Sequence, residues 1–129
     1  MKKVIALSLV GFLLVSGLSL RAQSIDGVVK GLKAGNAATV IANAGDNLAL
    51  TVPDKSDNYS KMQAQQVLKD FFAKTAVKGF DLKHKGDSPN GSYGIGTLAT
   101  AKGSYRVNIF MKKDGKQEVI KELRFQLIE

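Results

Sequence analysis

The spacing of apolar residues changes once along this chain, near residue 79, from a helical repeat to a twofold alternation. In residues 60–76 the apolar side chains recur three and four positions apart and form one stripe along a helix. They are Ala64, Val67, Leu68, Phe71 and Phe72. Beyond residue 79 apolar and polar residues alternate, which is typical of strands with one buried face. The pattern predicts an α+β fold in which helices pack on a sheet.

Four strands are expected in the second half of the chain, separated by turn-forming sequences. The separators are residues 86–92 (GDSPNGS), residues 101–103 (AKG) and Asp114-Gly115, the last of which is a strong hairpin signal. Such short connections predict an antiparallel meander. The apolar residues that mark the four strands are Phe80 and Leu82 with His84; Tyr93, Ile95 and Leu98; Tyr105, Val107, Ile109 and Met111; and Val119, Leu123, Phe125 and Leu127.

The first half carries weaker signals. Residues 24–45 predict two short helices, with Ser24 and Asn36 as N-caps and Gly35 as the stop between them. Residues 47–52 alternate and predict a further strand, which ends at Pro53. Residues 54–58 (DKSDN) are expected to form a loop.

The N-terminus has the pattern of a secretory signal peptide. Lys2 and Lys3 precede an uncharged run over residues 4–20, and Ala22 suits a cleavage site. We expect cleavage of residues 1–22, which leaves a single domain over 23–129 that is exported to the periplasm or outside the cell. The alternative is a single membrane span, because the run reaches the lower length limit for crossing a bilayer.

Charge and composition exclude several classes of function. Without the leader the chain carries 16 basic and 11 acidic residues, a net charge of +5, and only Arg106 and Arg124 are arginines. The lysines are spread along the chain, so we expect no nucleic-acid partner, and an anionic envelope component is at most a weak one. One histidine and no cysteine offer no ligand spacing for a metal, and no cofactor is expected.

The sequence Gly94-Ile95-Gly96 resembles the start of a phosphate-binding loop but lacks its context. A dinucleotide fingerprint needs a third glycine, where this chain has Ala99, and a helix after it, where this chain predicts another strand. Glycine inside a strand commonly marks a bulge or a bend. We therefore interpret the motif as a device that bends the sheet.

The order of elements resembles the nuclear transport factor 2-like, or cystatin-like, superfamily, in which a curved sheet wraps a helix into a cone open at one end. A closer resemblance is carried by residues 32–52 (LKAGNAATVIANAGDNLALTV), 59–74 (YSKMQAQQVLKDFFAK), 91–116 (GSYGIGTLATAKGSYRVNIFMKKDGK) and 122–126 (ELRFQ). Together they are similar to a family of small exported proteins of Gram-negative bacteria, domain of unknown function 4783. This resemblance implies the cone-shaped fold and a place in the cell envelope, and it brings no catalytic residues.

Four residues are candidates for lining a pocket in such a cone: Tyr59, His84, Tyr93 and Tyr105. His84 shares strand parity with Phe80 and Leu82 and could act there as a base, or it is an exposed edge histidine. Tyr93 and Tyr105 either flank the mouth of the pocket or pack against each other across strands. Asp81 has the opposite parity and is expected to point outward.

Three hypotheses for function remain open. The leading one is an exported, non-enzymatic protein that binds a small apolar ligand or an envelope protein through the cone. The second is a small pocket enzyme that uses His84 or a tyrosine for acid–base chemistry. The third is a structural module that forms a homodimer through the outer surface of the sheet, where Arg106 and Arg124 are expected to lie. An inward-facing His84 or Asp81 would favour the enzyme, and a filled core would favour the module.

Overall fold

The computed structural model describes residues 24–128. The expected leader and its cleavage junction lie outside the described residues. The described residues form three helices, in the order expected from the apolar spacing. They are α2 (Ile25–Ala34), α3 (Ala37–Ile41) and, after two strands, α4 (Lys61–Thr75). The strands are β1 (Ala44–Val52), β2 (Lys55–Ser60), β3 (Val77–Ser88), β4 (Gly91–Thr100), β5 (Gly103–Asp114) and β6 (Gln117–Ile128).

The ends of the helices are set by their capping residues, as the sequence predicts for α2 and α3. The Ser24 side chain accepts a hydrogen bond from the Gly27 N–H at the start of α2, and Gly35, with φ of 64°, ends it in the left-handed region. Asn36 caps α3 through the Thr39 N–H. Helix α4 begins with a capping box between Ser60 and Gln63.

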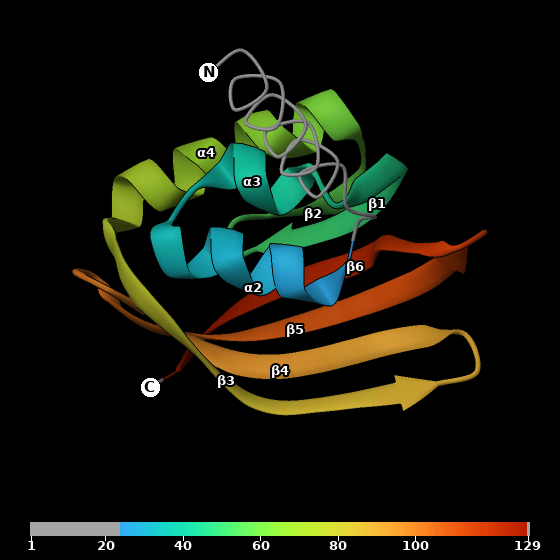
Figure 1. Ribbon diagram of the computed structural model, residues 1–129. Helices are drawn as coiled ribbons and strands as arrows, with labels where there is room; N and C mark the ends of the chain where they lie inside the picture. Colours follow the sequence, from blue (N-terminus) through green and yellow to red (C-terminus); the bar gives the residue numbers. More distant parts are fainter. Residues whose placement is uncertain (1–23, 129) are drawn as a thin grey trace, which may run out of the picture.

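The six strands form one open sheet in the order β2-β1-β6-β5-β4-β3. The expected antiparallel meander from β3 to β6 is confirmed. Strand β1 runs parallel to β6, so the sheet is mixed. All three helices lie on one face of the sheet, called here the inner face, and the sheet curves around them (Figure 1).

The prediction of a loop at residues 54–58 is wrong, because most of this segment belongs to β2. The chain reverses after Val52 and pairs antiparallel with β1, placing Tyr59 opposite Leu48 and Asp57 opposite Leu50. An edge strand needs only backbone hydrogen bonds to its single neighbour, so polar side chains are tolerated on both of its faces. For this reason β2 has no apolar alternation that the sequence could reveal.

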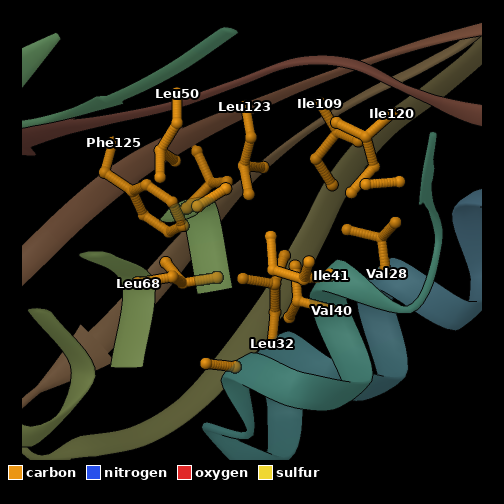
Figure 2. Close-up of a cluster of buried hydrophobic side chains, with 14 of the residues drawn as sticks. Val28, Leu32, Val40, Ile41, Leu50, Leu68, Ile109, Ile120, Leu123 and Phe125 are labelled. Atoms are coloured by element: carbon orange, nitrogen blue, oxygen red, sulfur yellow. The ribbon is translucent and has the colours of Figure 1, made fainter. Parts of the chain in front are cut away.

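The apolar stripes of the helices meet the inner face of the sheet in one continuous core. Figure 2 shows Val28 of α2 pointing toward Ile109 and Ile120, and Leu68 of α4 lying beside Phe125 of β6. A bulge between Ile120 and Glu122 shifts the alternation of β6. As a result Ile120, and not the predicted Val119, joins Leu123 in this core cluster, although Val119 is also buried.

Aromatic rings fill the centre of the space between helices and sheet. The ring centroid of Phe71 lies 5.1 Å from that of Tyr105, edge to face, and 5.1 Å from that of Phe125. Such contacts stabilise a core beyond the burial of area alone. The cone that the fold implies is therefore packed with side chains at its centre.

Gly94 and Gly96 lie on the inner face, where they leave room for neighbouring side chains. A Cβ on Gly94 would meet Ile25 of α2 at 3.1 Å, and one on Gly96 would meet the ring of Phe80. The irregularity expected at these glycines lies across the ladder, in a bulge of β3 between Leu82 and His84. Because Gly94 and Gly96 have no side chains, Ile25 of α2 and the ring of Phe80 can pack directly against the backbone of β4.

We predict that Gly96→Ala destabilises the domain by about 1–3 kcal/mol, because the added methyl group overpacks a filled site. Its Cβ would lie 2.5 Å from the carbonyl oxygen of Asp81 as well as against the Phe80 ring. Urea unfolding of the purified domain measures the change. Gly79→Ala is the matched control, since no atom lies within 4 Å of its Cβ position. Equal losses at Gly96 and Gly79 would contradict this account of the motif.

Candidate functional site

The four residues predicted to line a pocket are not brought together. Tyr105 is buried in the core against Phe71, and Tyr59 packs half-buried against the same core from β2. His84 and Tyr93 lie on the opposite, outer face of the sheet, where they pair with Ile95 and Phe110 respectively. Tyr93 and Tyr105 therefore share neither a pocket mouth nor a face of the sheet.

The predicted parity of His84 is wrong because of the bulge in β3. Leu82 pairs with Gly96 on the inner face, but the next pair in the ladder joins His84 to Ile95 on the outer face. One extra residue in a strand moves every later side chain to the other face. His84 is exposed, and its imidazole makes no hydrogen bond or ion pair within residues 24–128.

Asp81 points outward and is exposed, as its parity predicts. Its carboxylate lies 2.7 Å from the ammonium of Lys83. The hydrogen bond and the charge of Lys83 hold the pKa of Asp81 below its usual value of 3.8, and the charge of Lys33 adds to this. An ionised, solvated carboxylate of this kind is not a pocket acid.

The interior offers no set of groups for acid–base or metal chemistry. Within residues 24–128 no cluster of histidine and carboxylate side chains could hold a metal ion. The buried polar residues of this region are Asn43, Thr75, Ser92 and Thr100. Their buried side-chain atoms are satisfied, for example by the bonds that Asn43 makes to the Ser24 N–H and the Thr39 carbonyl. The side chains of Asn43, Thr75 and Thr100 bond to backbone groups, and the Ser92 hydroxyl donates to the carboxylate of Asp87.

The outer face of β4, β5 and β6 is free of the helices and has an unusual composition. We define this outer face by the twelve residues in register across the three strands: Tyr93, Ile95, Thr97, Ala99, Ser104, Arg106, Asn108, Phe110, Glu122, Arg124, Gln126 and Ile128. None of the twelve is buried and none is a lysine. They include both arginines of the described chain. Figure 1 shows that the described helices leave this side of the sheet open.

A groove of about 400 Å³ lies at one end of the outer face. Its apolar wall is the cross-strand pair of Tyr93 and Phe110, each 38% exposed. Lys121, the residue between the two ladder positions at the β6 bulge, and Glu122 also line the groove. An ion pair of 2.6 Å joins Glu122 to Arg124 and fixes the carboxylate in the row of outer-face residues. Two exposed rings beside fixed charges are a surface suited to recognition.

No described helix has the length and apolar content that a membrane span requires.

The sequence signal for an arginine-bearing outer surface was present in the strand parity of Arg106 and Arg124. The aromatic pair of Tyr93 and Phe110 was missed, because the parity of each residue gave no indication that the two rings are in register.

Several solved structures that are similar to the chain are members of one family. A protein described as a DUF4783 family protein from Bacteroides ovatus ATCC 8483 is 36% identical, covers 80% of this chain and 94% of its own, and has a TM-score of 0.76. Another, from Bacteroides uniformis ATCC 8492, is 31% identical, with coverages of 81% and 96% and a TM-score of 0.77. A comparison with curated proteins gave no match.

More distant structures share the fold. A protein with a cystatin-like fold from Nostoc punctiforme PCC 73102 matches with a TM-score of 0.62 at 11% identity, covering 81% of this chain and 85% of its own. An NTF2-like protein from Cytophaga hutchinsonii ATCC 33406 matches with a TM-score of 0.58 at 10% identity, with coverages of 81% and 86%. The expected nuclear transport factor 2-like, or cystatin-like, fold is thereby confirmed.

The family model described as domain of unknown function DUF4783 matches residues 25–126, which is nearly the whole of the described domain. This match agrees with the two Bacteroides structures and with the resemblance in residues 32–52, 59–74 and 91–116. The chain belongs to the DUF4783 family.

Proposed function

We propose that the chain is an exported, non-enzymatic interaction module whose outer face binds a second copy of itself. The observation that carries the proposal is the composition of the outer face, which exposes Tyr93, Phe110, Arg106 and Arg124 and contains no lysine. Protein interfaces are enriched in aromatic residues and arginine and depleted in lysine. In a chain with 16 lysines these twelve positions contain none, and Lys121 lies at their border, at the β6 bulge beside the groove.

The outer face carries charges of both signs, so it can be complementary to the same face of a second copy. A twofold axis brings the same surface of both subunits together, so the face has to carry groups of both signs. Arg106 of β5 and Arg124 of β6 lie in neighbouring rows, and the carboxylate of Glu122 lies on the same strand as Arg124. In a twofold pair the free guanidinium of Arg106 can meet a carboxylate of the partner.

The outer face is small for a stable dimer interface. Seven residues of a strand span about 23 Å, and three strands span about 14 Å, which gives a face of about 330 Å². A standard interface buries about 800 Å² on each partner. Self-association through this face is therefore expected to be weak and to depend on protein concentration.

The packed interior supports a protein partner over a small apolar ligand. A ligand in the cone would have to displace Phe71, Tyr105 or Phe125, which are in mutual contact. Enzymatic use of His84 lacks support, because the imidazole is exposed on the outer face and has no carboxylate partner within residues 24–128. Both alternatives are therefore weaker than the interaction module.

Export is supported by the N-terminal sequence alone. Lys2 and Lys3, the uncharged residues 4–20 and the small residue Ala22 follow the order of a secretory signal. The chain has no cysteine, so the domain depends on no disulfide after export.

We predict that residues 23–129 form a dimer and that Phe110→Glu weakens it at least about tenfold, because a charge replaces an anchor ring at the interface. Light scattering coupled to size exclusion, across a dilution series, measures the mass. Met62→Glu is the control, since Met62 is 84% exposed on α4, on the helical side of the sheet. A wild-type monomer at all concentrations would refute self-association, and equal weakening by both variants would refute this face.

We predict that the full chain, expressed in a Gram-negative host, is recovered from the periplasm with Gln23 as its first residue. N-terminal sequencing of the purified protein measures the cleavage site. Ala22→Arg is expected to block cleavage, because the site requires a small residue. An uncleaved wild-type chain in the membrane fraction would instead support the single-span alternative.

A further inference from the structure

A second groove lies on another side of the molecule, where α2 runs beside the edge strand β3. Its volume is about 560 Å³, within the range of ligand sites. The residues that line it are Asp26, Val29, Lys30, Lys33, Ala34 and Leu82. Five of the six come from one side of α2, at spacings of three and four residues, and the sixth comes from the inner face of β3.

The base of this α2–β3 groove is apolar. Val29 and Leu82 pack against the core with one side and remain half-buried, so each presents part of its surface to the groove. Ala34 extends this floor toward the end of α2. The distance from Val29 to Ala34 along the helix is about 7.5 Å. The floor therefore covers about six carbons of an extended hydrocarbon chain, so that a medium-length chain lies on it with part of its length.

The rim of the groove is basic. Lys30 and Lys33 are exposed, and within residues 24–128 neither makes an ion pair. The other two lysines nearby are already paired: Lys85 contacts Asp26 at 3.0 Å, and Lys83 contacts Asp81. The four lysines and two carboxylates leave a net charge of +2, carried by the two unpaired ammonium groups at the groove.

We propose that the α2–β3 groove binds a small amphiphilic anion, a medium-chain carboxylate, with its hydrocarbon on Val29 and Leu82 and its carboxylate between Lys30 and Lys33. Each unpaired ammonium offers three donors for the two carboxylate oxygens. The methylene stems of the lysines line the hydrocarbon while their heads remain in water. A neutral chain of the same length finds the same floor but leaves the two charges unmatched.

This site is independent of the proposed dimer. Lys30 and Lys33 lie on α2, which packs on the inner face, whereas the proposed interface is the outer face of β4 to β6. Loss of carboxylate binding therefore leaves the dimer intact, and loss of the dimer leaves the carboxylate site intact.

We predict saturable binding of decanoate to residues 23–129, with a Kd in the range of about 10⁻⁵ to 10⁻³ M. Nuclear magnetic resonance titration follows the methyl groups of Val29 and Leu82, and intermolecular contacts from the decanoate chain to these methyls locate the site. These contacts are measured on the wild-type chain, so the result does not depend on the folding of a variant. Decanoate contacts elsewhere, or shifts that do not saturate, would overturn the proposal.

The charge of the site is tested with the double variant Lys30→Glu and Lys33→Glu, which is expected to weaken decanoate binding at least about tenfold. Lys102→Glu with Lys116→Glu is the matched control, because it changes net charge equally at two exposed turns. Decanol has the same chain length and no charge. It is expected to bind the wild type more weakly than decanoate does, and to bind the double variant as well as it binds the wild type. Equal loss in both double variants, or equal affinity for decanol and decanoate, would overturn the assignment of the carboxylate to Lys30 and Lys33.

Discussion

The contact of α4 with the inner face of the sheet is the constraint on which the rest of the molecule depends. Phe71 packs edge to face on Tyr105 and lies 5.1 Å from Phe125, so one helix is fixed against two neighbouring strands. The sheet curves around this contact (Figure 1). Aromatic side chains occupy the volume in which a more hollow member of this fold could hold a ligand. The centre of the cone therefore serves stability, and both proposed binding sites lie on the surface.

Two surfaces of the domain differ in the cations that they carry. The outer face of β4 to β6 holds both described arginines and no lysine, while the α2–β3 groove is bordered by lysines. Arginine loses less on desolvation and suits a buried contact with a protein, whereas lysine keeps its ammonium hydrated at the edge of a site. This separation is the physical basis for assigning a protein partner to one surface and a small anion to the other.

Much of the fold followed from local signals. The caps at Ser24 and Asn36, the stop at Gly35, the helix that follows Ser60 and the meander were predicted, because each depends on residues close together in sequence. Strand β2 was missed, since an edge strand with polar side chains has no apolar period. His84 was placed on the wrong face, because a bulge is a property of the pairing between β3 and β4 and leaves no mark in the alternation of one strand.

The sequence by itself determined the helices and the strands other than β2, the apolar faces of α4 and β5, and the family to which the chain belongs. These depend on spacing and composition, which are properties of one segment at a time. The tertiary structure alone decided that the interior is filled, that Tyr93 pairs with Phe110 on the outer face and that α2 forms a groove with β3. Each of these depends on the distance between side chains far apart in the chain, and periodicity contains no information about that distance.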